Sequence, residues 1–362
     1  MKNIKRIFIT HLLPRPLIAQ HGLSFAACNF SYDLISKGSF DCVYSLMPLF
    51  VRGRLDDSAF RDARFTLVYQ QGLRRMGWIG RNVASLDEQW KVFRKIPSEA
   101  SVWFYNLTIH NVFLFILLKL FRRKVQLNFI VLDLTPPFSL FSRNRLFLRL
   151  INGAHGRICL SHSELFRSDN SIILPGVVGM DVNNIPQLTQ RNNRFLLCGV
   201  MNETISQTSL VLRTFAQLPQ CELHITGMPD DEAIVKEYAA RYPNIKYHGI
   251  LSFDDYTQLL DTVTFVLSTR HPQSPENQCN FPSKILEALL HNRIVISTMH
   301  YPQLQGIRYF EVPSEEDAFR EGIKKIVGMD DKQLTEYANQ HQLIYDRFNA
   351  GVWKEAMEKV ES

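Results

Sequence analysis

The 362-residue sequence predicts an α/β protein built on two open parallel sheets, each covered by helices on both faces. Short apolar runs of strand length alternate with helical patterns from end to end, which is typical of parallel sheets. A polar stretch rich in Asn and Gln, residues 177–193, interrupts the alternation, and we place a linker there. The length also suits two domains of roughly 150–200 residues.

The expected elements divide between an amino-terminal domain, 1–176, and a carboxyl-terminal domain, 194–331, followed by a tail, 332–362, that reads as helical throughout and is expected to cross back to the first domain. Strands of the first domain are expected at 6–10, 40–47, 65–70, 102–106, 125–133, 157–161 and 171–174, and helices at 24–36, 83–94, 110–121 and 140–152. In the second domain we expect strands at 195–200, 222–226, 246–250, 264–268 and 294–298, with helices near 206–217, 231–241, 254–261 and 283–291.

Charge is distributed unevenly along the chain. Residues 1–175 hold 24 Lys and Arg against 11 Asp and Glu, a net of +13, whereas residues 176–362 hold 17 against 24, a net of −7. A basic half suggests an anionic partner: a lipid headgroup, a phosphate-bearing acceptor or nucleic acid. No nucleic-acid-binding motif accompanies the charge, so we expect no nucleic acid. The basic and aromatic segments 119–124 and 141–150 are candidates for an anionic membrane surface, or equally for helices with solvated arginines.

Cysteine spacing and hydropathy favour a cytoplasmic protein, either free in the cytoplasm or at the inner face of a membrane. The six cysteines form no CxxC pair and no zinc-like spacing, which indicates reduced core residues. No secretory signal is visible, and no apolar run reaches the ~18–20 residues of a membrane-spanning helix. Neither a metal site nor a cofactor is expected, because the histidines and carboxylates show no ligand spacing.

Residues 281–298, FPSKILEALLHNRIVIST, form the most informative segment. Pro282 suits a first helical position, and apolar residues then recur on one helical face. Lys284 in the first turn would place a positive charge where a diphosphate could bind, and Glu287 one turn later could accept hydrogen bonds from a diol such as a ribose. Alternatively, both are solvated surface residues.

This segment resembles the carboxyl-terminal signature of GT-B glycosyltransferases, especially the retaining family 4 group. The resemblance implies a GT-B fold, in which two Rossmann-like domains face each other across a cleft. It further implies transfer of a sugar from a nucleotide diphosphate sugar, such as a UDP-sugar, to a saccharide or lipid-linked glycan acceptor, with retention, in bacterial surface polysaccharide biosynthesis. Lys284, Arg270 and Glu287 would then be the catalytic residues.

The sequence departs from that family at two places. After Gly199, Asn202, Glu203 and Thr204 stand where the family often has Arg and Lys. The family usually has two glutamates eight positions apart, but Cys279 stands eight residues before Glu287, and Glu276 lies three residues earlier still. Two alternatives therefore stay open: a sugar-nucleotide epimerase with the same fold, and a non-catalytic subunit that binds a nucleotide-sugar or a glycan.

The resemblance also implies which residues bind each substrate, although a simple turn or cap would explain many of them singly. The expected donor-binding residues are Gly199, Asn202, Gly227, Gly249, Ile250, Leu251, Phe281, Pro282, Ser283, Lys284 and Glu287. The expected acceptor-binding residues of the amino-terminal domain are His11, His21, Gly22, Asn106, His110 and Asp133.

Overall fold

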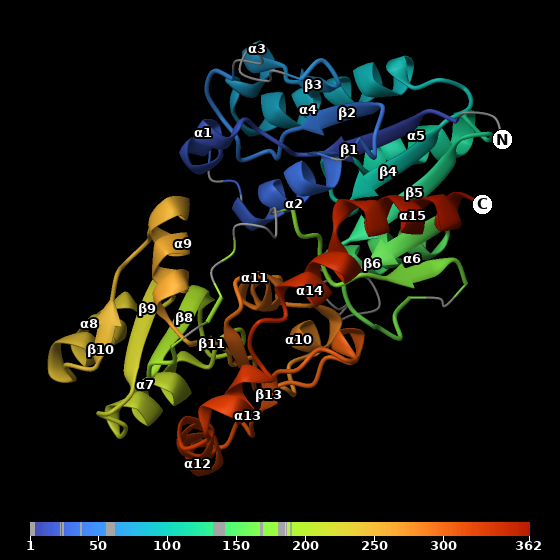
Figure 1. The fold of residues 1–362 in the computed structure, drawn as a ribbon. Coiled ribbons are helices and arrows are strands. Elements are labelled where there is room, and N and C mark those ends of the chain that lie inside the picture. Colours follow the sequence, from blue (N-terminus) through green and yellow to red (C-terminus); the bar gives the residue numbers. More distant parts are fainter. Residues whose placement is uncertain are drawn as a thin grey trace. The chain divides into compact units, whose positions relative to one another are not determined.

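The computed structural model describes residues 4–21, 23, 25–36, 38–55, 62–132, 142–166, 169–179, 185, 187–188 and 190–362. The chain divides into two compact units (Figure 1). Unit 1 comprises Met1–Gly179 together with Asn349–Ser362, and unit 2 comprises Met180–Phe348. Each unit is an α/β structure around a parallel sheet, so the predicted fold class is confirmed.

The sheet of unit 1 has the strand order β3-β2-β1-β4-β5-β6-β7, with every described pair parallel. Its strands are β1 Arg6–Thr10, β2 Cys42–Leu46, β3 Phe65–Val68, β4 Ser101–Tyr105, β5 Gln126–Val131, β6 Gly156–Cys159 and β7 Ser171–Ile173. The order reverses between β1 and β4, which are neighbours in the sheet, with Ile7 opposite Val102. Such a reversal is the usual ligand-binding position in open α/β sheets.

Unit 2 repeats this arrangement with the order β10-β9-β8-β11-β12-β13. Its strands are β8 Arg194–Met201, β9 Glu222–Pro229, β10 Ile245–Tyr247, β11 Phe265–Ser268, β12 Ile294–Ser297 and β13 Phe310–Glu311. Here the order reverses between β8 and β11, where Phe195 lies opposite Phe265.

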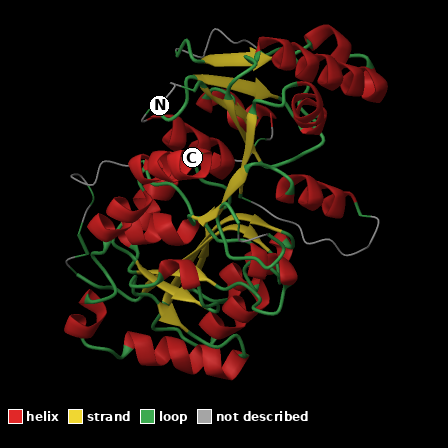
Figure 2. Ribbon diagram, turned by 90° about the vertical axis from the view of Figure 1, so that its right-hand side faces the viewer, coloured by secondary structure: helices red, strands yellow, loops and turns green. Residues whose placement is uncertain are grey.

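Helices cover both faces of the sheets (Figure 2). Those of unit 1 are α1 Arg15–Ile18, the 3-10 turn η1 Ala19–His21, α2 Phe25–Ser36, α3 Gln71–Arg74, α4 Gly77–Lys95, α5 Val112–Phe121, α6 Arg143–Asn152 and α15 Ala350–Glu361. Those of unit 2 are α7 Thr208–Ala216, α8 Glu232–Arg241, α9 Phe253–Thr262, α10 Pro275–Cys279, α11 Lys284–Leu290, α12 Glu316–Val327, α13 Asp331–Thr335 and α14 His341–Phe348, with the 3-10 turn η3 Pro302–Leu304.

Aromatic packing fills the centre of each unit. In unit 1 the ring of Phe115 lies 5.8 Å from that of Phe104 and 5.3 Å from that of Phe129. In unit 2 Phe195 stacks on Phe265 at 4.6 Å. Because both faces of a parallel sheet are covered, its central strands read as continuous apolar runs, and this made them easy to predict.

The last helix, α15, packs in unit 1 beside α2 and β6 (Figure 1). Trp353 is fully buried and donates from Nε1 to the carbonyl of Gly176 at 2.7 Å. Near the chain end, Glu361 Oε1 accepts hydrogen bonds from Arg6 Nε at 2.8 Å and from Trp103 Nε1 at 2.8 Å. A segment distant in sequence therefore completes the core of unit 1.

The tail is not helical throughout, so that prediction is wrong. It contains three helices separated at 336–340 and at Asn349. Asn339 has a φ of +54°, which a continuing helix does not allow, and the side chain of Asn349 accepts from the amides of Gly351 and Val352 to cap α15.

Helix α4 begins six residues earlier than predicted because its first turns contain glycines, which disfavour helix in isolation. Gly80 fits there because a Cβ would overlap the backbone oxygen of Leu73 in the adjoining α3. Among the described residues, no helix is both long and apolar enough to cross a membrane.

Candidate functional sites

Two glycines lie opposite each other at the carboxyl ends of β8 and β9. Gly199 pairs with Gly227, and their φ values of +104° and +127° favour glycine. A Cβ on Gly227 would overlap the carbonyl oxygen of Gly199, so the two backbones approach too closely for any side chain. The carbonyl of Gly249 accepts from Gly227 N at 2.9 Å and from Thr226 Oγ1 at 2.8 Å. Three predicted donor-binding glycines therefore lie at one edge of the sheet.

Lys284 reaches this edge from the start of α11. Its ammonium donates to the carbonyl of Cys198, and a Cβ on Gly199 would overlap Lys284 Nζ. The absence of a side chain at Gly199 thus makes room for the cation at the carboxyl end of β8. The sequence separates these two residues widely, and only the fold brings them together.

Helix α11 starts at Lys284 with the exposed Ser283 as its N-cap, so the prediction that Pro282 is the first helical residue is wrong. The chain before Lys284 forms a tighter turn, in which Ile285 N donates to Pro282 O at 3.0 Å. Phe281 is buried, with its ring 5.2 Å from that of Tyr301, so it packs the base of the loop.

Glu287 lies one turn beyond Lys284 and is partly buried. Tyr256 of α9 donates to Glu287 Oε2 at 2.9 Å. Burial raises the pKa of Glu287, while that hydrogen bond and the charges of His291 and Lys284 oppose the shift. Burial also raises the pKa of Tyr256 well above its ordinary value, so the phenol keeps its proton and acts as the donor.

Arg270 follows β11, the neighbour of β8 in the sheet. Its backbone oxygen accepts from Gln207 Nε2 at 3.0 Å, and its Nη1 donates to Asn277 Oδ1 at 3.2 Å. Asn277 is buried and also donates to Thr204 O at 2.7 Å, which ties α10 to the loop after β8. The predicted clamp of Arg270 and Lys284 on one diphosphate stays a prediction.

Some predicted donor residues have identifiable local roles. Asn202 caps the turn after β8, because its Oδ1 accepts from Thr204 N at 3.0 Å and from Ile205 N at 2.7 Å. Ile250 is 74% exposed next to Gly249, whereas Leu251 is half-buried. At the departure from the family pattern, Cys279 ends α10 and Glu276 lies in its first turn, both partly buried.

Sequence reasoning missed Tyr256 and Asn277. Nothing in the pattern around either residue distinguishes it from an ordinary helix residue. Their roles depend on partners 31 residues away for Tyr256 and 73 residues away for Asn277.

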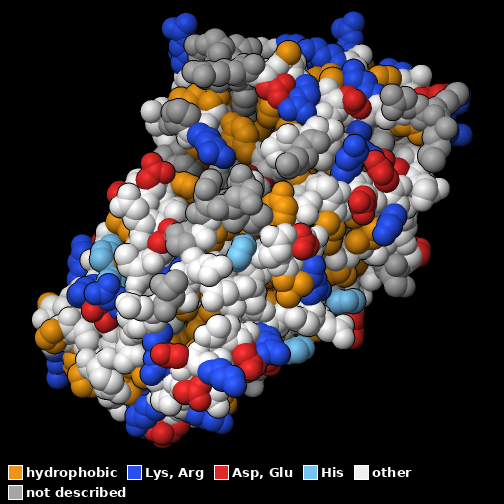
Figure 3. Space-filling view, viewed as in Figure 1, with side chains coloured by type: hydrophobic (Ala, Val, Ile, Leu, Met, Phe, Trp, Pro, Cys, Tyr) orange, Lys and Arg blue, Asp and Glu red, His pale blue; other side chains and the backbone are white. Residues whose placement is uncertain are grey.

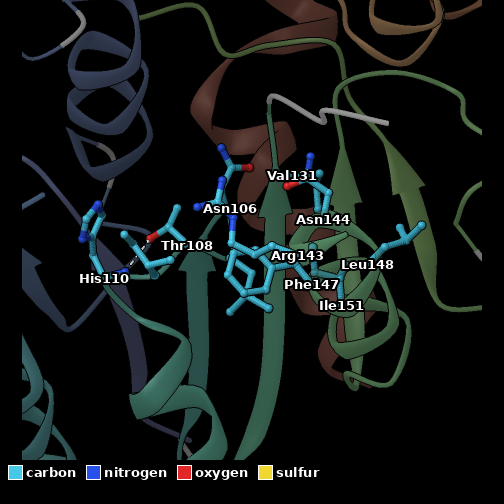
Figure 4. Close-up of a pocket in the computed structure, with 11 residues that line it drawn as sticks. Asn106, Thr108, His110, Val131, Arg143, Asn144, Phe147, Leu148 and Ile151 are labelled. Atoms are coloured by element: carbon cyan, nitrogen blue, oxygen red, sulfur yellow. Dashed lines mark hydrogen bonds between the residues drawn. The ribbon is translucent and has the colours of Figure 1, made fainter. Parts of the chain in front are cut away.

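Unit 1 contains a cavity of about 270 Å³ at the carboxyl ends of β4 and β5. Asn106, Thr108 and His110, from the segment after β4, lie on one side, and Arg143, Asn144 and Phe147 of α6 lie on the other (Figure 4). The remaining lining residues are Leu107, Ile109, Val131, Leu148 and Ile151. The cavity therefore combines an apolar floor with a guanidinium, amides and an imidazole.

The histidines near the β1–β4 reversal are neutral near pH 7. Burial lowers the pKa of His11 to about 4, and its ring meets that of Tyr105 edge-on at 5.0 Å. Burial, with the charges of Arg74, His11 and Arg143, lowers the pKa of His110 to about 4. His110 Nδ1 is buried and has no hydrogen-bond partner among the described residues. A neutral imidazole offers one donor and one acceptor nitrogen.

The predicted acceptor residues do not all line this cavity. Asn106 and His110 do, although Asn106 Oδ1 already accepts from Leu132 N at 2.8 Å. His21 ends η1 and is half-buried. Gly22 and Asp133 lie outside the described residues. Arg143, which lies in one of the two segments that are candidates for a membrane surface or for a helix with solvated arginines, lines the cavity.

Two units of this strand order make the GT-B fold of glycosyltransferases. The solved structure of Anabaena HepE in complex with UDP is 16% identical, covers 98% of this chain and 99% of its own, and has a TM-score of 0.67. The N-terminal domain of Candida albicans trehalose-6-phosphate phosphatase is 11% identical, with 98% and 95% coverage and a TM-score of 0.70.

A trehalose-phosphate synthase (UDP-forming) from Burkholderia xenovorans, in complex with glucose-6-phosphate, is 11% identical, with coverage of 99% and 100% and a TM-score of 0.67. No protein-family model matches the sequence, and no curated protein sequence matches it. At these identities the likeness establishes the fold, while the chemistry depends on the residues of the site.

Proposed function

We propose that the protein is a hexosyltransferase-type glycosyltransferase that moves a sugar from a UDP-sugar to a saccharide or lipid-linked glycan acceptor. The observation that carries this proposal is the ammonium of Lys284 beside the side-chain-free Gly199, with Glu287 one helical turn further on. Retention of anomeric configuration and a role in bacterial surface polysaccharide synthesis extend the proposal by resemblance. The UDP complexes of the fold neighbour HepE support the choice of nucleotide.

The donor would bind at the carboxyl ends of β8, β9 and β11. The ammonium of Lys284 has three N–H donors, and one of them donates to Cys198 O, so the other two can bind diphosphate oxygens. Glu287 Oε2 accepts a hydrogen bond from Tyr256, so Oε1 would accept hydrogen bonds from the ribose diol. Backbone groups near Gly227, Gly249 and Leu251 would contact the nucleobase.

Catalysis would come mainly from stabilising the departing diphosphate. Negative charge grows on that group as the glycosidic bond breaks, and Lys284, with Arg270, would neutralise it. The acceptor hydroxyl would then attack the same face of the sugar, held in position by protein contacts. In this step the bond between the sugar C1 and the diphosphate oxygen breaks, the bond between C1 and the acceptor oxygen forms, and the proton of the acceptor hydroxyl passes to the departing diphosphate oxygen.

The cavity in unit 1 would hold part of the acceptor. The neutral imidazole of His110 can form a hydrogen bond with a sugar hydroxyl, and Arg143 can bind an anionic or carbonyl oxygen. The apolar lining of the cavity suits the less polar face of a sugar ring.

A binding subunit is the second candidate, and Cys279 is the observation that favours it. If the site binds a donor without turnover, Cys279→Glu should create or raise transfer activity. If the site is already catalytic, the same substitution should damage it.

The first test is calorimetric titration with UDP, GDP, ADP and CMP, with and without EDTA. We expect binding of UDP that survives EDTA, and a loss of about a hundredfold in affinity or turnover for Lys284→Ala and for Glu287→Ala, the effect of removing a charged hydrogen bond. Lys324→Ala, an exposed lysine of α12 paired with Glu321, is the matched control and should leave affinity unchanged. Unchanged binding in both site variants would refute the site.

A further inference from the structure

Helix α4 exposes a row of large apolar side chains. Ile79, Val83, Leu86 and Trp90 are 70%, 48%, 49% and 45% exposed, at spacings of four, three and four residues that place them along one face of the helix. Trp78 at the start of the helix is 70% exposed. An amphipathic helix normally turns such a stripe toward the core, yet here Ala84, Glu88 and Val92 face inward.

The row continues onto α5. Trp90 stacks on Phe93 with ring centroids 5.4 Å apart, and Phe93 meets Phe121 edge-on at 6.5 Å. Phe121 is 67% exposed, and Leu120 and Ile116 beside it are 60% and 39% exposed. We call these side chains, with Trp78 and the four residues of the row, the α4–α5 surface. Soluble monomers rarely expose a contiguous apolar patch of this kind unless it binds something.

Basic residues surround the α4–α5 surface. Residues 71–124 contain ten Lys and Arg against three Asp and Glu. Each of the three acids has a cationic partner: Glu88 pairs with the buried Arg74, Asp87 with Lys91 and Glu99 with Lys124. The exposed cations beyond these pairs include Arg75, Arg94, Lys95 and Arg123. Figure 3 shows lysine and arginine side chains, with hydrophobic ones between them, along the upper edge of unit 1.

We propose that the α4–α5 surface binds in the plane of an anionic phospholipid bilayer. Tryptophan and phenylalanine favour the interface between headgroups and acyl chains, and cations at the rim favour anionic headgroups. At 1.5 Å per residue, the 19 residues of α4 lie along roughly 28 Å of such a surface. Segment 119–124, one of the two candidate membrane-facing segments, contributes Leu120 and Phe121 to this surface.

Charge argues against a second copy of the chain as the occupant. A two-fold contact through this surface would bring the same basic rim of both copies together, which like charges oppose. An anionic bilayer offers the opposite charge and an apolar layer at once. The proposal does not depend on the transfer reaction.

The test is partition onto vesicles of phosphatidylcholine with about 30% phosphatidylglycerol, compared with pure phosphatidylcholine, at about 0.1 M and about 0.5 M salt. We expect binding to the anionic vesicles that weakens at high salt, with a blue shift of tryptophan emission. The shift would come from Trp78 and Trp90, because Trp103 and Trp353 are already fully buried.

Two variant sets separate the apolar and the charged contributions. Ile79→Gln with Leu86→Gln should reduce partition at least about tenfold, and Arg94→Glu with Lys95→Glu and Arg123→Glu about a hundredfold or more. The matched control joins Ile234→Gln and Lys236→Glu, which change exposed residues of α8 in unit 2 and should leave partition unchanged.

The proposal fails if wild-type protein does not bind anionic vesicles, or if both variant sets bind as well as the wild type. It also fails if light scattering shows a dimer that the glutamine variants dissociate, since a second copy would then cover the surface. The proposal is equally overturned if the α4–α5 surface binds an acidic protein and does not bind anionic vesicles. Urea unfolding followed by tryptophan fluorescence, which reports on unit 1, shows that the variants are folded. A failure to bind UDP would bear on the transferase proposal alone.

Discussion

The two units share a strand order and differ in what they place at its reversal. In unit 2, Gly199 near the end of β8 and Arg270 after β11 flank the reversal, with the cation of Lys284 in the space that Gly199 leaves. In unit 1, His11 after β1 and Asn106 to His110 after β4 flank it, and the histidines are neutral. The same topology thus positions a cationic, glycine-lined site in one unit and an uncharged imidazole pair in the other. The fold selects the place, and the side chains select the chemistry.

The units also differ in how the chain builds them. Unit 2 is one continuous segment, whereas unit 1 needs α15 from the far end of the chain. Tryptophan fluorescence can follow unit 1 alone, because all four tryptophans, at 78, 90, 103 and 353, belong to it.

The largest effect is expected from Trp353→Ala. Removing this fully buried ring, and its hydrogen bond to Gly176 O, should lower the free energy of unfolding of unit 1 by about 3–5 kcal/mol. Urea unfolding followed by tryptophan fluorescence measures it, and calorimetry should still find UDP binding by unit 2. The exposed Trp90→Ala is the control and should cost less than about 1 kcal/mol. Parallel loss of UDP binding would show that the two units unfold together.

A pH effect of intermediate size separates the units by its sign. The pKa of His11 in the folded state, about 4, lies below its ordinary 6.5. Its neutral form therefore stabilises unit 1 fully above pH 6.5, and that stability is lost as the pH falls toward 4. Between pH 7.5 and pH 5 the loss is about 2 kcal/mol for this one group.

His11→Phe keeps an aromatic ring against Tyr105 and cannot titrate, so it should reduce the pH dependence of unit 1 and leave the share of His110. Glu287 in unit 2 acts in the opposite direction, because its raised pKa makes protonation at low pH favour the folded state. Hydrogen exchange at pH 7.5 and pH 5, resolved by peptide, measures both units. An unchanged pH slope in His11→Phe would contradict the assignment.

The smallest expected effect concerns Gly199. Gly199→Ala puts a methyl group where Lys284 Nζ lies, so UDP affinity should fall about tenfold. The positive φ of this residue also strains an alanine, which lowers the stability of the fold. Gly306→Ala is the matched control, since its φ of +82° carries the same strain and a Cβ there meets only Arg347 Nη1 at 3.8 Å. Equal UDP affinity in the two variants would contradict a role of Lys284 in nucleotide binding.

Local sequence patterns predicted most strands closely. Strand β1 matches its predicted range, and β11 and β12 differ from theirs by one residue, because buried parallel strands are continuous apolar runs bounded by polar residues. The start of α4 and the breaks in the tail were not predicted. Whether a glycine or a single asparagine continues or ends a helix depends on contacts with neighbouring elements.

The sequence by itself determined the α/β alternation, the charge difference between the two halves, and the placement of Lys284 and Glu287 one turn apart, all of which follow from short-range spacing. Only the tertiary structure decided that Lys284 lies beside Gly199, that Tyr256 binds Glu287, and that α15 completes unit 1. It also decided that the apolar row of α4 faces outward, although the same periodicity is typical of a core-facing helix. The physical reason is that periodicity shows which residues share a face, whereas contacts between distant segments decide what that face meets.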